Sequence, residues 1–310
     1  MKAAQINDYG DSSSIQINEA EKPTVTDDKV LVEVGAAGLN PFDLAVLAGF
    51  AKSMAPLVFP ATLGQDFAGT IVEVGANVSN FAIGDRVYGT ANAMFGGSGA
   101  FAEFTLADVS NIAHTPDELS DVEAASLPTA GISALQAIDT MNVQNGNNVF
   151  INGGSGGVGS IAIEIAKSRG AHVATTVSGV NIDYTKSLGA DEVIDYKTVL
   201  YSDVIHDYDS LLNNVRSNDN DKLLRTLKKG GVAVSLVGPF DEDLAKKLGV
   251  ATSAQMTHIN NESLTKLAQL IDQGVVHATI DRTLSLNQIK DAYDALANES
   301  IRGKIVISIR

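Results

Sequence analysis

Residues 149–159 read VFINGGSGGVG, a short apolar run that leads directly into a glycine-rich turn. Gly154, Gly156 and Gly159 fit the spacing G-x-G-x-x-G, which is typical of turns that hold the pyrophosphate of a dinucleotide. In such a turn the first glycine permits the tight bend, the second lets the phosphates approach, and the third lets the helix pack on the strand. Residues 161–167 are apolar at helical spacing, and the first N–H groups of such a helix point at the anion. The stretch predicts a strand, a phosphate-binding turn and a helix, although glycine-rich loops often only turn the chain.

After this turn, apolar runs alternate with helical stretches. We expect helices over residues 181–188 and 219–229, the second closed by Gly230 and Gly231. Alternation of this kind is typical of a parallel sheet that is covered on both faces, that is, a doubly wound α/β fold. The further strands are expected at residues 172–177, 192–194, 208–212 and 232–237.

Ligands bind such sheets outside the carboxyl ends of the strands. We therefore expect three segments to lie close together at this edge: the glycine turn at 154–159, the end of the second strand at 177–178 and the end of the fifth strand at 237–238. Val237 and Gly238 are candidate cofactor-binding residues for this reason.

The remaining sequence lacks this alternation. Up to about Val109 it holds short β-like runs, for example at 30–34 and 69–74, punctuated by glycine and proline. This pattern predicts an antiparallel, barrel-like domain. The last run, at 303–309, is again a strand and most simply pairs with that domain. We therefore expect a β-rich domain of residues 1–121 and 277–310, with a nucleotide-binding domain of residues 122–276 inserted in it.

Composition limits the possible functions. The 310 residues are enough for two domains with separate cores. No apolar run approaches the roughly 20 residues of a membrane helix, and the N-terminus lacks the apolar core of a signal peptide, so we expect a cytoplasmic protein without a membrane partner. The formal net charge of −15 argues against nucleic-acid binding, which normally shows as a basic face.

The chain contains no cysteine, which removes disulfides, thiolate nucleophiles and every cysteine-based zinc site. No two of its histidines have the i, i+4 spacing that places a ligand pair on one helix face. We expect no metal, and we interpret the histidines as surface or structural residues. They are His114, His172, His206, His258 and His277.

Seven motifs are spread over nearly the whole length of the chain. In chain order they are GLNPFD at 38–43, LGQDFAG at 63–69, GAFAEF at 99–104, LPTAGISA at 127–134, the glycine turn at 154–159, SLGADEVIDY at 187–196 and GKIV at 303–306. Together and in this order they resemble the medium-chain dehydrogenase/reductase superfamily in its zinc-free quinone oxidoreductase branch. The resemblance implies a Rossmann doubly wound domain plus a GroES-like barrel domain, and relatives that are often dimers, joined through the edge of the nucleotide-domain sheet.

The departures inside these motifs indicate the branch. Zinc-dependent relatives place a cysteine at Asn40 and Gly-His-Glu at Gly64, Gln65 and Asp66. Neutral amides do not replace a thiolate and an imidazole as zinc ligands, so alcohol oxidation through a zinc-bound alkoxide is disfavoured. The reaction that fits is hydride transfer from a reduced nicotinamide to an acceptor that is already electrophilic.

The resemblance makes Asn40 and Asp43 the candidate catalytic residues. The Asn40 amide would hydrogen-bond the developing oxyanion of the substrate, and Asp43 would orient Asn40 or tune the pocket. The alternative is structural: an Asn-Pro turn in which Asp43 caps a short helix over residues 43–47. Some relatives carry a tyrosine where this chain has Ala45, and we identify no general acid in the sequence.

Cofactor choice depends on the end of the second strand. NAD-specific sites usually place an acid there to hold the ribose 2′-hydroxyl, and here no acid follows until Asp183. We therefore expect NADPH rather than NADH. Relatives commonly have a lysine or arginine at Asn181, so Ser178, Asn181 and Tyr196 remain as neutral donors for the 2′-phosphate.

The other candidate cofactor residues come from the turn and from one helix. Ser155 would donate to the pyrophosphate, and Ser133 matches a hydroxyl that the family places near the cofactor; a backbone hydrogen bond within its own helix is an equal alternative for Ser133. The candidates in the turn are Gly154, Ser155, Gly156, Gly157, Val158 and Gly159.

The sequence thus predicts an NADPH-dependent, zinc-independent reductase of a quinone or similar electrophilic carbonyl compound, as a homodimer. Two alternatives remain open: an alkenal or enone double-bond reductase with the same cofactor, and a non-catalytic NADPH-binding redox sensor.

Overall fold

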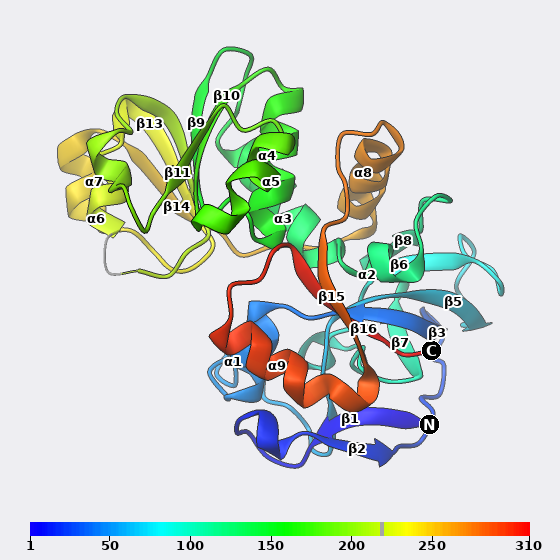
Figure 1. The fold of residues 1–310 in the computed structure, drawn as a ribbon. Coiled ribbons are helices and arrows are strands. Elements are labelled where there is room, and N and C mark those ends of the chain that lie inside the picture. The colour runs from blue at the N-terminus through cyan, green and yellow to red at the C-terminus, as the bar shows by residue number, and fades with distance from the viewer. Residues whose placement is uncertain (218–219) are drawn as a thin grey trace. The chain divides into compact units, whose positions relative to one another are not determined.

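The computed structural model describes residues 1–217 and 220–310. The chain forms two compact units, each drawn in Figure 1. Unit 1 consists of Met1–Thr129, Ile259–Asp272 and Ala278–Arg310. Unit 2 consists of Ala130–His258 and Gln273–His277.

Unit 2 contains a six-stranded parallel sheet with the strand order β11-β10-β9-β12-β13-β14. Counted along the chain this is 3-2-1-4-5-6, the order of a doubly wound dinucleotide-binding fold, with its switch point between β9 and β12. The predicted fold class of this region is therefore confirmed. The strands are β9 (Asn148–Asn152), β10 (His172–Val177), β11 (Glu192–Asp195), β12 (Tyr208–Asn213), β13 (Leu227–Ser235) and β14 (Ala251–Ala254).

Helices cover both faces of this sheet, with α4 and α5 on one side and α6 and α7 on the other (Figure 1). Because both faces are covered, the strands bury apolar side chains such as Phe150 and Leu211 completely. This explains why the strands appear in the sequence as nearly continuous hydrophobic runs. The helical segments are α3 (Pro128–Thr140), α4 (Gly157–Ser168), α5 (Ile182–Ser187), α6 (Asn220–Leu224), α7 (Glu242–Leu248), and the 3-10 turns η4 (Gly179–Asn181) and η5 (Tyr201–Asp203).

The predicted helix over residues 219–229 is wrong in its second half. Helix α6 ends at Leu224, and β13 already begins at Leu227; residue 219 lies outside the described residues. Leu227 pairs with Tyr208 of β12, and its side chain is buried. Pairing with the neighbouring strand thus outweighs the helical propensity of the lysine-rich segment.

Unit 1 is β-rich, as expected. A three-stranded sheet has the order β2-β1-β4, and a seven-stranded sheet has the order β15-β16-β3-β5-β6-β8, with β7 paired to β3. The short sheet consists of β1 (Lys2–Ile6), β2 (Gln16–Glu19) and β4 (Ala61–Thr62). The larger one consists of β3 (Lys29–Gly38), β5 (Asp66–Val74), β6 (Arg86–Thr90), β7 (Phe104–Asp108), β8 (Ile112–His114), β15 (Ile280–Ser285) and β16 (Lys304–Ser308).

The C-terminal strand β16 pairs antiparallel with β3, which confirms that the end of the chain returns to the N-terminal domain. Side chains of these sheets form the core of unit 1 together with α9, whose Tyr293 packs edge-on against Phe101. The helical segments are α1 (Pro41–Leu47), α2 (Asp121–Ala125), α8 (Asn261–Asp272), α9 (Ile289–Asn298), and the 3-10 turns η1 (Ser12–Ser14), η2 (Ala93–Phe95), η3 (Val109–Asn111) and η6 (Leu286–Gln288).

The two units differ from the expected domain boundaries in three places. Residues 122–129 and 259–272 belong to unit 1, and His277 belongs to unit 2. In the first place α2 packs against β3 and β5, and in the second α8 packs against β8, where Asn261 Nδ2 donates to the Ile112 carbonyl at 2.7 Å. These contacts join segments far apart in sequence, so hydrophobic periodicity does not reveal them.

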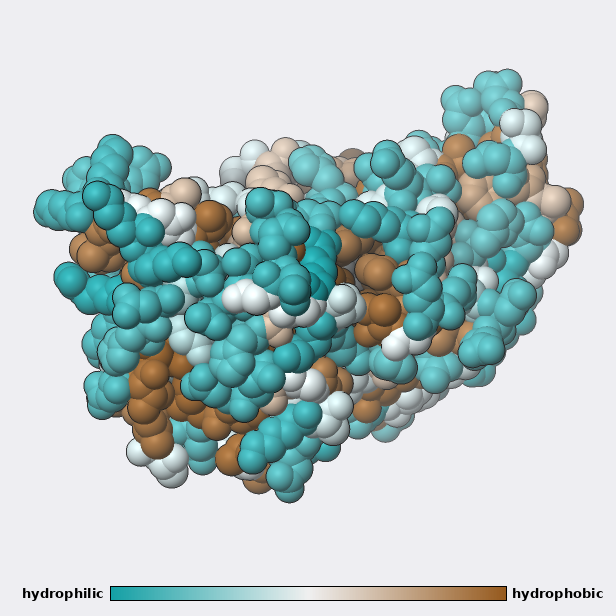
Figure 2. Space-filling view, turned by 90° about the horizontal axis from the view of Figure 1, so that it is seen from above, coloured by the Kyte–Doolittle hydropathy of each residue, from teal (hydrophilic) through white to brown (hydrophobic). Residues whose placement is uncertain are grey.

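Hydrophilic side chains cover most of the face in Figure 2, with hydrophobic ones between them. Among the described residues, no helix has the length and apolar character needed to cross a bilayer.

Candidate functional site

The turn between β9 and α4 is built on glycines with different surroundings. A Cβ on Gly159 would lie 2.1 Å from the Gly153 carbonyl oxygen, so only glycine lets the helix approach the strand here. A Cβ on Gly156 would meet nothing nearer than 3.9 Å. There is therefore space beside Gly156, and Gly157 and Val158, which follow it, begin α4.

The tight bend falls one residue earlier than predicted. Gly153, not Gly154, has a positive φ, of +90°. Gly154 is needed for a different reason, since a Cβ there would lie 2.0 Å from Thr175 Oγ1 of the neighbouring strand. Gly153 is thus a functional glycine that the motif spacing alone did not identify.

Three of the predicted cofactor residues lie together at the end of β10. Asn181 Nδ2 donates to Ser178 Oγ at 3.2 Å and to Ser155 Oγ in the glycine turn at 3.3 Å. Tyr196 follows β11, and its backbone N–H donates to the Val177 carbonyl at 3.1 Å. The Tyr196 side chain is about half exposed, at 52%. The structure therefore gathers Ser155, Ser178 and Asn181 beside the turn, and the backbone of Tyr196 is bound to the end of β10.

An acid that the sequence reading missed also reaches this place. Asp195, the last residue of β11, lies opposite Val177, the last residue of β10. A Cβ on Gly179 would lie 2.7 Å from Asp195 Oδ2. No acid follows the second strand in sequence before Asp183, but strand pairing supplies a carboxylate from the third strand.

The other predicted residues are more dispersed. Ser133 is buried in α3, where its Oγ lies 2.6 Å from Thr257 Oγ1. Val237 and Gly238 follow β13, and the Val237 N–H donates to Ser235 Oγ at 3.3 Å. These two residues lie on the carboxyl edge of the sheet, as expected.

Unit 1 contains a buried polar network around Lys304, called here the Lys304 cluster and made of Asn40, Asp43, Asp66, Thr129 and Lys304. Lys304 Nζ donates to the Leu39 carbonyl at 2.6 Å and to Asn40 Oδ1 at 2.5 Å. Asn40 Nδ2 donates to Asp66 Oδ2 at 2.9 Å. These two bonds fix the orientation of the Asn40 amide.

The two aspartates of the cluster are also tied into the surrounding backbone. Asp43 lies in the first turn of α1, and its Oδ2 accepts from the Asn40 N–H at 2.7 Å. Asp43 therefore does take part in helix capping, but the helix begins at Pro41 with Asn40 as its N-cap, two residues earlier than the sequence suggested. Asp66 accepts from the Thr129 N–H at 3.0 Å and from Thr129 Oγ1 at 2.6 Å.

Burial dominates the electrostatics of the Lys304 cluster. It raises the pKa of Asp43 to about 7, with the charge of Asp66 adding to the shift and the Asn40 N–H and Lys304 opposing it. Burial also raises the pKa of Asp66 and lowers the pKa of Lys304. Lys304 is 7% exposed, and nothing in its sequence context marked it as a member of the site.

These residues do not fit zinc. Asn40 Oδ1 accepts from the Lys304 ammonium, so a cationic group already contacts the amide at the position where zinc-dependent relatives have a cysteine. Gln65 Nε2 donates to Thr129 Oγ1 at 2.9 Å, and its Oε1 accepts from Asn92 Nδ2 at 3.0 Å. In residues 1–217 and 220–310, no group of three or more His, Cys, Asp or Glu side chains is arranged to hold a metal ion.

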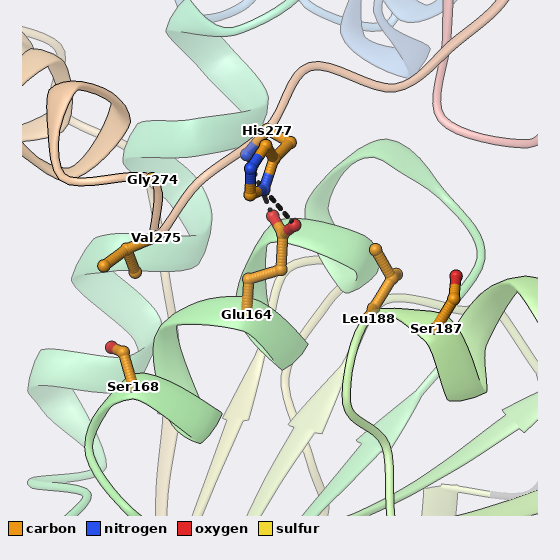
Figure 3. A pocket seen from close by; sticks show the side chains of 7 residues that line it. All are labelled: Glu164, Ser168, Ser187, Leu188, Gly274, Val275 and His277. Carbon is orange, nitrogen blue, oxygen red and sulfur yellow. Dashed lines mark hydrogen bonds and ion pairs between the residues drawn. The ribbon is translucent and has the colours of Figure 1, made fainter.

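A separate pocket of about 460 Å³ lies on the helical layer of unit 2 (Figure 3). His277 Nδ1 and Glu164 Oε1 are 2.8 Å apart there, and burial raises the pKa of Glu164. The pocket lies beside α4 beyond its first turn, so it is distinct from the glycine turn at the helix N-terminus. Its lining residues are Glu164, Ser168, Ser187, Leu188, Gly274, Val275 and His277.

Two protein families match the chain. The alcohol dehydrogenase GroES-like domain matches residues 26–117, and the zinc-binding dehydrogenase family matches residues 188–307. The first match falls in unit 1, and the second begins directly after α5 and ends within β16.

Individual proteins extend these matches. The chain is 33% identical to 2-methylene-furan-3-one reductase of Solanum lycopersicum over 317 residues, which are 99% of this chain and 79% of that protein. It is 36% identical to the chloroplast envelope quinone oxidoreductase homolog of Arabidopsis thaliana over 201 residues, which are 63% of this chain but only 60% of that relative.

The structure of the quinone oxidoreductase from Coxiella burnetii superposes with a TM-score of 0.94 at 31% identity, and covers 100% of this chain and 99% of that one. The sequence motifs, the strand order and these similarities all indicate the same superfamily. The chain belongs to the medium-chain dehydrogenase/reductase superfamily, with quinone oxidoreductases among its relatives.

Proposed function

We propose that this chain is an NADPH-dependent reductase that transfers hydride to a quinone or a similar electrophilic carbonyl compound without zinc. The β9–α4 turn carries the proposal, since Gly156 leaves its backbone accessible in a sheet of dinucleotide-binding order. A bound reduced nicotinamide supplies the hydride, and the protein supplies binding, orientation and electrostatics. The names of the relatives support the choice of a quinone as acceptor.

Asn40 is the proposed donor to the substrate oxygen, and Asp43 the residue that holds its backbone. One amide hydrogen of Asn40 is bound to Asp66, whereas the contact of Nδ2 with the Gly38 carbonyl is long, at 3.5 Å. The second hydrogen is therefore weakly engaged and is the one we assign to the substrate oxygen. Because Lys304 and Asp66 fix the amide, the donor is oriented before the reaction begins.

NADPH is the proposed cofactor, with Ser178, Asn181 and Tyr196 as donors to its 2′-phosphate. These groups are neutral, and the Asp195 carboxylate beside Gly179 opposes a phosphate dianion. We therefore propose a modest preference for NADPH, with NADH also accepted.

A second candidate is reduction of an enone double bond with the same cofactor. The full-length similarity to 2-methylene-furan-3-one reductase favours it specifically. Both reactions begin with hydride transfer to an electrophilic π-system, so they differ in the substrate pocket and not in the nucleotide site.

The proposal is tested in two steps. The protein is first titrated with NADPH and with NADH. 1,4-Benzoquinone or an enone is then added while the nicotinamide absorbance is recorded. We expect saturable nucleotide binding and quinone-dependent oxidation that a chelator does not abolish. Turnover with the enone alone would select the second candidate. Binding without turnover of either acceptor would indicate a redox sensor, and absence of nucleotide binding would refute the proposal.

A further inference from the structure

The Asn40 amide lies between a cation and an anion inside unit 1. Lys304 Nζ donates to Asn40 Oδ1 at 2.5 Å, and Asn40 Nδ2 donates to Asp66 Oδ2 at 2.9 Å. All three side chains are buried. Water screens buried charges poorly, so the charge of Lys304 acts over several ångströms.

The hydrogen bonds of the Lys304 ammonium go to neutral groups. The Leu39 carbonyl and Asn40 Oδ1 both accept from Lys304 Nζ. The Asp66 carboxylate accepts from Asn40 and from Thr129. A neutral donor at position 304 would orient the amide as well, without the cost of taking a charge out of water. The positive charge at this position therefore calls for a further explanation.

Strand pairing places the ammonium at the oxygen end of the amide. Val306 of β16 pairs antiparallel with Gly38 of β3, and continuing this register by two residues sets Lys304 opposite Asn40. A cation on the oxygen of an amide draws electron density toward it and makes the N–H groups stronger donors. An oxygen that accepts from Asn40 Nδ2 would lie about 7 Å from Lys304 Nζ, given ordinary hydrogen-bond lengths. At that separation a unit charge changes the rate of forming an anion by at least about tenfold in a protein interior.

Reduction of the acceptor creates a charge of the opposite sign. In the proposed reaction the acceptor takes a hydride, that is, a proton with two electrons, and the nicotinamide is oxidised. The π bond of the acceptor opens, and its oxygen carries the negative charge until it takes a proton from water. A positive charge near this oxygen stabilises the anion more than the neutral acceptor, so it favours the transition state.

We propose that Lys304 is a positioning residue whose positive charge acts through the Asn40 amide on the oxygen of the acceptor. The inference rests on the proposed function, in which Asn40 donates to this oxygen, and adds the source of the charge that stabilises the anion. Lys304 itself does not need to touch the acceptor, since the amide carries its effect.

The charge of Asp43 should then oppose that of Lys304. The groups that face Asp43 are Asp66 from β5, Lys304 from β16 and the Tyr293 hydroxyl from α9. Burial raises the pKa of Asp43 to about 7, so this carboxyl becomes negative as pH rises through neutrality. Tyr293 keeps its proton, because burial and Asp43 raise its pKa. We therefore expect stabilisation of the anion to weaken as pH rises through 7.

A double-mutant cycle of Lys304→Met and Asn40→Ala tests whether the charge acts through the amide. We measure kcat/KM for 1,4-benzoquinone at pH 6 and saturating NADPH, below the melting temperature of each variant. Lys304→Met should lower kcat/KM at least tenfold in the unaltered chain but less than twofold in the Asn40→Ala background. Equal losses in both backgrounds would indicate a purely structural role and overturn the inference. The matched control, Lys52→Met at an exposed lysine of unit 1, should change kcat/KM less than twofold in either background.

A second measurement does not depend on whether Lys304→Met folds. Between pH 6 and pH 8 we expect kcat/KM of the unaltered chain to fall about threefold to tenfold, and Asp43→Asn, which does not ionise, to remove most of this fall. The same pH dependence in both proteins would show that the charge of the Lys304 cluster does not reach the acceptor, and the inference would fail. If the unaltered chain bound NADPH without reducing 1,4-benzoquinone, or bound no nucleotide, the proposed quinone reduction would fail instead.

Discussion

At the scale of single residues, Lys304 holds the centre of unit 1 together. Its ammonium contacts Asn40 and the Leu39 carbonyl inside a region that also contains two buried aspartates. Removing one partner from a buried group of charges lowers the free energy of unfolding strongly, because the remaining charges stay buried without a counter-charge.

We therefore expect Lys304→Met to lower the free energy of unfolding by about 3–5 kcal/mol, measured by urea denaturation. The control is Lys52→Met, at an exposed lysine of the same unit, with an expected change within about 0.5 kcal/mol. A loss below about 1 kcal/mol for Lys304→Met would show that the two carboxyls do not depend on this cation.

Asp43 makes stability depend on pH in a stated direction. Its pKa is about 7 in the folded chain against 3.8 as the ordinary value, so the folded state keeps a proton that the unfolded state has released. The stability from this group is complete below pH 4 and is lost as pH rises to about 7, at no more than about 1.4 kcal/mol per pH unit.

Urea denaturation between pH 4.5 and 7.5 measures this effect. We expect Asp43→Asn to lose less stability than the unaltered chain as pH rises, because the amide does not ionise. The histidines are common to both proteins, so the difference between the two curves isolates the carboxyl. Parallel curves would rule out titration of Asp43 in this range.

At the scale of elements, two glycines of the β9–α4 turn are expected to serve different purposes, one in folding and one in cofactor binding. Gly159 is required for packing of helix on strand, and Gly156 faces open space with an ordinary extended backbone, φ −77° and ψ 171°. One motif thus contains a glycine that the fold needs and another that the fold does not need and that we propose binds the cofactor.

Gly156→Ala should therefore fold normally, with a free energy of unfolding within about 0.5 kcal/mol of the unaltered chain, and bind NADPH at least tenfold more weakly. Gly159→Ala should lose about 1–3 kcal/mol of stability, because its Cβ would overlap the Gly153 carbonyl. Thermal unfolding and calorimetric titration of both variants provide the comparison. If Gly156→Ala bound NADPH normally, the phosphates would not approach at this glycine.

A comparison of the expected and observed elements shows where hydrophobic periodicity predicts secondary structure correctly. The strand expected at 172–177 coincides with β10, because every residue from Val173 to Val177 is buried in the sheet. The helix expected over 219–229 was wrong because strand pairing at Leu227 is a long-range interaction that no local pattern carries.

At the scale of the whole molecule, 37 acidic and 22 basic side chains give a net charge of −15. Like charges on the surface oppose the compact state. Raising NaCl from about 10 to about 100 mM shortens the screening length from about 30 to about 10 Å. We expect the urea midpoint to rise over this range, and a fall would mean that attractive ion pairs, such as Lys167 with Asp191, outweigh the repulsion.

The sequence by itself determined the fold class, the position of the glycine-rich turn between strand and helix, and the superfamily, because these depend on glycine spacing, on runs of apolar residues and on their order along the chain. The tertiary structure decided which atoms meet. Strand register brought Asp195 to the end of β10, and the pairing of β16 with β3 brought Lys304 to the other residues of its cluster in unit 1. Each of these depends on contacts between distant segments and on desolvation, neither of which is written in the local order of residues.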